Sequence, residues 1–61
     1  MNEYLKYAIT VARNNNNRIR LMLEYDNVSE SLKDLFRLQL EQNDELIRIF
    51  EKEINDKNNK G

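Results

Sequence analysis

Three basic side chains are spaced so that one side of a helix would carry them all. Lys6, Arg13 and Arg20 stand seven residues apart, with Thr10 and Asn17 between them. In a helix these five residues lie on one side. Such a row could contact the phosphates of RNA or DNA. Because no aromatic side chain for base stacking accompanies the row, a solvated face opposite the core is the alternative interpretation.

Paired carboxylates in the second half of the chain suggest metal binding as a further chemistry. The acidic set comprises Asp34, Glu41, Asp44, Glu45, Glu51 and Glu53. Helical di-metal sites combine such carboxylates with Glu-x-x-His motifs, and the chain has no His. Glu41 and Glu45 stand one turn apart and would suit magnesium, but Asp44 and Arg48 form an ordinary i,i+4 surface pair. We therefore expect no metal site.

The composition excludes most other catalytic chemistry. The 61 residues include no Cys, His, Trp or Pro and only one Gly. Without Cys and His, the chain has no disulfide, thiol nucleophile, classical zinc site or imidazole base near neutral pH. Without Pro or an internal Gly, it also lacks the turns of a β-rich fold and a Gly-rich phosphate loop. We expect no enzymatic activity, no catalytic residue and no cofactor.

Two helices must position these side chains. In each half, apolar and amide positions recur in alternating steps of four and three residues, which is the pattern of a packed helix. The sequence predicts an all-α fold, an antiparallel helical hairpin with helices over about residues 2–25 and 29–56. Asn27 followed by Glu30 is a capping-box variant, and Ser29 is the competing N-cap. We expect residues 1–56 to form the hairpin and residues 57–61 a flexible polar tail.

A run of asparagines, residues 14–17, places weak helix formers in the first helix. A break there would divide the helix into two pieces. We expect a continuous helix, because the heptad phase is the same on both sides of the run and a break would shift it.

Both stripes become polar at the same level of the hairpin. Folding at the turn places Asn15 opposite Gln39, and Ala12 opposite Gln42 and Asn43. A buried amide left unpaired would cost about 1–3 kcal/mol, so these groups should bond one another, backbone or water. We interpret Asn15, Gln39, Gln42 and Asn43 as a polar layer that fixes register and oligomeric state. The alternatives are a small-ligand pocket and amides exposed by helix rotation.

The hydrophobic stripes are wider than the contact within one hairpin requires. A chain of this length buries only about 60% of the surface that its unfolded form exposes. Because no disulfide or metal adds stability, we expect self-association into a homodimer or a higher oligomer, most simply a four-helix bundle. The predicted oligomer core comprises Leu5, Ala8, Ala12, Ile19, Met22, Leu32, Leu35, Phe36, Leu46, Ile47, Phe50 and Ile54.

Neither a membrane span nor a secretion signal is visible in the sequence. The longest apolar runs, residues 7–9 and 21–23, are three residues long. A bilayer span needs ~20 residues. Residues 1–4 lack the basic and apolar regions of a signal peptide. We expect a cytoplasmic protein with no membrane partner. The abundance of Asn, Ile and Lys, which AT-rich codons encode, suggests a bacterium or its phages and plasmids.

We expect a small non-enzymatic regulator or inhibitor that binds a larger partner protein. The net charge of -1 gives no overall attraction to nucleic acid or to an anionic membrane. The candidate partner-binding residues lie outside the hydrophobic stripes and are Lys6, Arg13, Asn17, Arg20, Arg37, Glu41, Asp44 and Arg48.

In outline, two long antiparallel helices, a tight turn and a polar tail resemble the Rop family of plasmid copy-number hairpins. The resemblance covers most of the chain, rests on length and periodicity, and includes no shared motif. It implies binding of paired RNA loops along the first helix. An RNA- or DNA-binding hairpin is therefore the alternative function, and a small-ligand-binding helical oligomer is the third.

Overall fold

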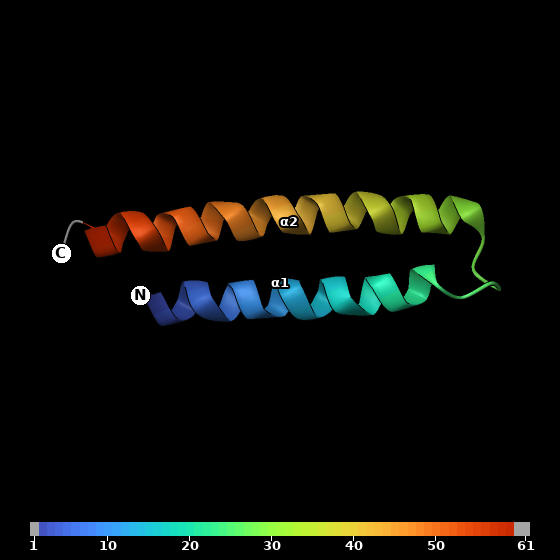
Figure 1. Ribbon diagram of the computed structural model, residues 1–61, viewed down its shortest axis with the longest axis horizontal. Coiled ribbons are helices and arrows are strands. Elements are labelled where there is room, and N and C mark those ends of the chain that lie inside the picture. The colour runs from blue at the N-terminus through green and yellow to red at the C-terminus, as the bar shows by residue number, and fades with distance from the viewer. Residues whose placement is uncertain (1, 60–61) are drawn as a thin grey trace.

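The chain folds into a hairpin of two long helices. The computed structural model describes the backbone of residues 2–59 and the side chains of residues 3–56. Helix α1 (Asn2–Leu23) and helix α2 (Glu30–Asn59) run antiparallel, side by side (Figure 1). Neither described helix is long and apolar enough to cross a membrane. The molecule is a rod of 50 × 15 × 12 Å. The predicted all-α helical hairpin is confirmed.

Helix α1 ends two residues before the predicted end because its last turn tightens. The amide of Glu24 donates to the carbonyl oxygen of Leu21 over 3.1 Å, and the amide of Tyr25 donates to that of Met22 over 3.3 Å. Bonds between residues three apart are those of a 3₁₀ turn, which often closes an α-helix. The α-helix therefore stops at Leu23, and residues 24–29 form the connection to α2.

The asparagine run lies within α1 and does not interrupt it. Weak helix propensity costs at most about 0.7 kcal/mol per residue relative to Ala. Contacts with α2 offset this cost, because Asn16 is buried and its side chain bonds to α2. The continuous helix expected from the constant heptad phase is therefore the one observed.

Helix α2 begins directly after an N-cap, Ser29. The Oγ atom of Ser29 accepts a hydrogen bond from the amide of Leu32 over 3.3 Å. The carbonyl oxygen of Ser29 accepts one from the amide of Lys33 over 3.0 Å. Of the two caps that the sequence allows, Asn27 and Ser29, the structure selects Ser29. Glu30 adds negative charge at the positive end of the helix dipole.

Helix α2 extends beyond α1 at both ends of the rod (Figure 1). At the loop end, residues 24–29 connect the end of α1 to the start of α2. The register in which the two helices pair differs from the predicted one. Asn43, instead of Gln39, bonds to Asn15, a shift of about one helical turn along α2. At the other end α2 continues to Asn59. Residues 57–59 of the expected tail are thus helical, and residues 60–61 lie outside the described residues.

The contact between α1 and α2 buries few hydrophobic side chains. Within the described part of the chain, the buried hydrophobic residues are Ile9, Ile19, Ile47 and Ile54. Leu5, Ala12 and Phe50 are partly buried and pack against the cluster formed by three of these isoleucines. A single hairpin therefore has a thin core, as its small size leads one to expect.

The predicted oligomer core divides into two parts in the single hairpin. Its buried and half-buried members are Leu5, Ala8, Ala12, Ile19, Phe36, Ile47, Phe50 and Ile54. Its exposed members are Met22, Leu32, Leu35 and Leu46, whose exposed fractions range from 39% to 61%. The buried line of α1 passes through Ile9 and Asn16, one position after the predicted Ala8 and Asn15. This rotation of α1 turns Met22 away from α2.

Candidate interaction surfaces

Polar side chains from both helices form one hydrogen-bonded cluster near the middle of the hairpin. Its members are Asn15, Asn16, Gln39, Asn43 and Asp44. The Nδ2 atom of Asn43 donates to Oδ1 of Asn15 over 2.8 Å and to Oδ1 of Asn16 over 2.9 Å. The Oδ1 atom of Asn43 accepts from Nε2 of Gln39 over 3.0 Å. Asn16 in turn donates from Nδ2 to Oδ1 of Asp44 over 2.9 Å. We call this group the amide cluster.

The amide cluster satisfies its own most deeply buried members. Asn16 is 2% exposed and Asn43 is 6% exposed. Among residues 3–56, every buried side-chain nitrogen or oxygen has a hydrogen-bond partner. Because an unpaired buried amide costs about 1–3 kcal/mol, mutual bonding is what makes this polar core tolerable. The cluster therefore has no orphaned buried group to offer a small ligand.

The amide cluster differs in membership from the predicted polar layer. Gln42 is exposed and takes no part in the bonds described above, whereas the other three predicted members belong to the cluster. Asn16 and Asp44 belong to the cluster although neither was predicted as part of the polar layer. Asn16 stands seven residues after the buried Ile9, a spacing that could have revealed it. For Asp44 the expected partner was Arg48, and the observed partner is Asn16.

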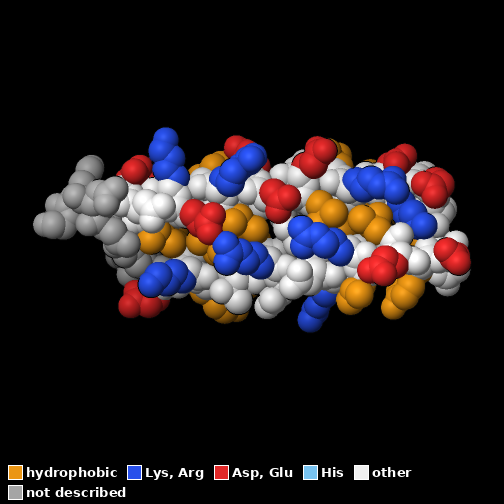
Figure 2. All heavy atoms as spheres, in the orientation of Figure 1, with side chains coloured by type: hydrophobic (Ala, Val, Ile, Leu, Met, Phe, Trp, Pro, Cys, Tyr) orange, Lys and Arg blue, Asp and Glu red, His pale blue; other side chains and the backbone are white. Residues whose placement is uncertain are grey.

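One broad side of the hairpin carries charged and amide side chains from both helices around two adjoining hollows. We call it the charged face. The residues that define it are Lys6, Arg13, Asn17, Arg20, Asp44, Arg48 and Glu51. Figure 2 shows a broad face on which basic and acidic side chains follow both helices, with hydrophobic side chains between them.

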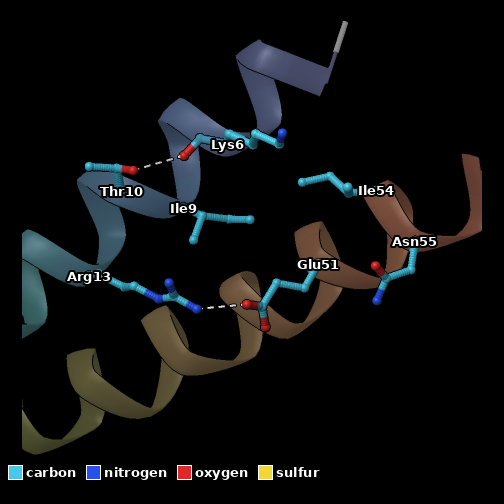
Figure 3. Close-up of a pocket in the computed structure, with 7 residues that line it drawn as sticks. All are labelled: Lys6, Ile9, Thr10, Arg13, Glu51, Ile54 and Asn55. Atoms are coloured by element: carbon cyan, nitrogen blue, oxygen red, sulfur yellow. Dashed lines mark hydrogen bonds and ion pairs between the residues drawn. The ribbon is translucent and has the colours of Figure 1, made fainter. Parts of the chain in front are cut away.

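An ion pair joins α1 to α2 across the charged face. Arg13 and Glu51 point toward each other over one hollow (Figure 3), and Nη2 of Arg13 donates to Oε2 of Glu51 over 2.7 Å. Their side chains are 59% and 45% exposed, so solvent screens the pair. Exposed pairs of this kind contribute at most about 1 kcal/mol. The pair thus orients side chains more than it stabilises the hairpin.

The structure brings together the side chains predicted to bind a partner. Six of the eight line the two hollows of the charged face, namely Lys6, Arg13, Asn17, Arg20, Asp44 and Arg48. The other two, Arg37 and Glu41, stand seven residues before Asp44 and Arg48 and therefore lie along the same side of α2. Arg37 pairs with Asp34 over 2.9 Å, and Arg48 pairs with Glu45.

Acidic side chains of α2 lie beside the basic row of α1. Glu51 bonds directly to Arg13. Asp44 lines the same hollow as Arg13 and Arg20. The positive field of the row is therefore partly cancelled by α2, which weakens the attraction that a phosphate backbone would feel.

The opposite broad side exposes hydrophobic side chains from both helices, and we call it the apolar face. It is defined by Tyr4, Val11, Met22, Leu32, Leu35, Leu46 and Ile49. Tyr4 and Val11 stand two residues before Lys6 and Arg13, about 200° around α1, so they lie on the other side of the hairpin. Leu46 likewise stands two residues before Arg48 on α2.

The apolar face spans both helices and is exposed along its length. A hollow lined by Met22 of α1 and Leu35 of α2 joins the two helices on this side. The exposed fractions of the hydrophobic side chains range from 39% for Met22 to 76% for Tyr4. Large hydrophobic side chains that are exposed together on one side are typical of an interaction site in soluble proteins.

The carboxylates are spread along α2 instead of gathering at one point. Among the described residues, no three Asp or Glu side chains lie close enough together to hold a metal ion. At the start of α1, a backbone hydrogen bond to Glu3 holds the pKa of its exposed carboxyl below the usual 4.5. A carboxylate that accepts a backbone bond at a helix N-terminus is a capping interaction, which needs no ligand to explain it.

No protein-family model matches the chain, and no curated protein or solved structure is significantly similar to it.

Proposed function

We propose that the protein is a small non-enzymatic regulator or inhibitor that acts by binding a larger protein. In this proposal, two copies associate through their apolar faces into a four-helix bundle. The charged faces then remain on the outside, where they contact the larger partner. The protein would act in the cytoplasm of a bacterium and be encoded by that bacterium or by its phage or plasmid.

The extent of the apolar face is the observation that carries this proposal. One hairpin buries four isoleucines among its described hydrophobic residues, while seven large hydrophobic side chains of the apolar face are 39–76% exposed. Burying a fully exposed side chain of this size contributes about 1.5–3 kcal/mol, and each of these side chains gains the part that corresponds to its exposed fraction. The face is therefore a strong driving force for association and has no evident role in an isolated chain.

The mixed charges of the charged face favour a protein partner over a nucleic acid. Arg13 is already paired with Glu51, and Asp44 lies near Arg20 in the same hollow. A protein surface can offer carboxylates to the arginines and basic groups to the acids, whereas a phosphate backbone offers only negative charge. RNA or DNA binding is the alternative outcome of the test below.

Association is tested by measuring molar mass in solution. We expect light scattering to give the mass of a dimer at micromolar concentration for the native chain, and of a monomer for the Leu35→Glu/Leu46→Glu variant. The matched control is Leu21→Glu, because Leu21 is 59% exposed and stands eleven residues after Thr10, on the side of α1 away from the apolar face. A native chain that is helical and monomeric would refute the association.

The role of the charged face is tested by capturing partners from the native host. We expect proteins retained by the native chain to be lost with Arg20→Glu/Arg48→Glu and kept with Lys52→Glu, whose site lies on the outer side of α2. Treatment with nuclease separates the two candidate partners. If the charge reversal abolishes retention of RNA or DNA instead of protein, nucleic acid replaces the protein partner.

A further inference from the structure

A polar belt crosses the middle of the apolar face. Its members are Asn15, Arg18, Gln39 and Gln42. Asn15, Arg18 and Gln39 line one hollow together with Met22 and Leu35. The belt members follow the heptad rows of the face, since Val11 precedes Arg18, Leu32 precedes Gln39 and Leu35 precedes Gln42, each by seven residues. The face is thus apolar toward each end of the rod and polar between.

We infer that a second copy of this chain covers the apolar face, belt against belt, with α1 of each copy lying over α2 of the other. The loops of the two copies then lie at the same end of the bundle. This inference rests on the association proposed above and adds the arrangement of the two copies.

The belt favours a second copy as the occupant. A partner that covered the face with hydrophobic side chains alone would leave Arg18 and Gln42 buried without hydrogen-bond partners, which is unfavourable for both groups and most of all for the charged Arg18. A two-fold axis in the plane of the face, through its centre, brings the belt of one copy against that of the other. The amide oxygens of Gln39 and Gln42 can then accept hydrogen bonds from Arg18 of the opposite copy.

The extent of the face also matches that of a standard protein–protein interface. A face 50 Å long and 15 Å wide covers about 750 Å² on each copy, close to the ~800 Å² per partner of a standard interface. The belt occupies only the middle of this area, so hydrophobic side chains meet toward both ends.

The charges of the helices decide between the two possible two-fold axes. Helix α1 carries four basic and one acidic side chains, a net +3, and α2 carries five basic and eight acidic ones, a net -3. An axis parallel to the helices places α1 over α2 of the other copy, so that helices of opposite net charge are neighbours and Arg18 lies over the Gln39 and Gln42 side of α2. An axis perpendicular to them places α1 over α1 of the other copy and brings the two Arg18 side chains near each other. Like charges in close juxtaposition oppose that second arrangement.

Distances between the two loops test the arrangement. The chain has no native Cys, so Asn27→Cys in the exposed loop can carry a single spin label. In the inferred arrangement the labels are separated by little more than one helix layer, below about 25 Å by double electron–electron resonance. In the perpendicular arrangement they are separated by about the 50 Å length of the rod. Ser31→Cys, at the start of α2, provides a second label at the same end.

The possible outcomes separate this inference from the proposed function. A short distance at both sites supports the arrangement. A distance near the 50 Å length of the rod overturns the arrangement but leaves the association standing. A labelled chain that shows no dipolar coupling and has the mass of a monomer overturns both the arrangement and the association. A different protein then covers the apolar face.

Discussion

At the residue scale, the amide cluster is the feature on which the hairpin depends most. Asn43 uses both hydrogens of its amide and its carbonyl oxygen at once, for Asn15, Asn16 and Gln39. Because Asn16 is almost wholly buried, removing a partner leaves part of its bonding capacity unmet. The stability of the cluster thus depends on mutual bonding and not on any one amide.

We expect Asn43→Ala to destabilise the hairpin by about 1–3 kcal/mol, because buried amides lose their partner. The measurement is urea unfolding followed by circular dichroism at a fixed protein concentration. The control is Asn55→Ala, which removes an exposed amide of the same helix that belongs neither to the cluster nor to the apolar face. Equal stability of the two variants would contradict the role of the cluster.

The sequence predicted that amides meet at one level, and it could not say which ones. Asn15, Gln39 and Asn43 follow from the shared interruption of the two stripes. Asn16 and Asp44 depend on the rotation of α1 by one position and on a register shift of about one turn. Heptad spacing alone determines neither this rotation nor this shift.

At the element scale, neighbouring asparagines of α1 are expected to respond oppositely to the same substitution. Asn14→Ala should stabilise the hairpin by about 0.5 kcal/mol, because Asn14 is exposed and Ala is the better helix former. Asn16→Ala should destabilise it, because that side chain is buried and bonded to Asn43 and Asp44. Urea unfolding measures both, and stabilisation by both substitutions would contradict the observed rotation of α1.

The start of α2 provides a second prediction at this scale. Ser29→Ala should lower the free energy of unfolding by about 1 kcal/mol, the usual contribution of an N-cap hydroxyl. Asn27→Ala is the matched control, because Ser29 and not Asn27 accepts the first-turn amide. Thermal unfolding measures the difference in stability between the two variants. A larger effect of Asn27→Ala would identify Asn27, and not Ser29, as the N-cap.

At the scale of the whole molecule, the hairpin has two unlike broad faces and a thin core between them. If the apolar faces associate, folding and dimerisation are linked, and the unfolding temperature depends on protein concentration. We expect it to rise when the concentration is raised from 5 to about 500 μM, as circular dichroism can measure. The Leu35→Glu/Leu46→Glu variant should unfold at a lower temperature that does not change with concentration.

The architecture was more accessible from the sequence than the division into faces. Alternating steps of four and three residues predicted two helices and a hairpin, and the described helices agree with that prediction. The two faces follow only from the observed packing, because stripes as wide as these fit several rotations of each helix. The exposure of Met22 and Leu35 on the same side is the result of one such rotation.

The connection between the helices has a consequence for the shape of the folded chain. Residues 24–29 contain no Gly or Pro, and no residue in the described part of the chain has a positive φ. Every backbone conformation in the loop is thus open to ordinary residues, and no steric block prevents the helix from continuing through it. The bend is maintained by the Ser29 cap and by contact between the helices. Two chains that straightened could exchange the same contacts, in a domain-swapped rod nearly twice as long as the hairpin.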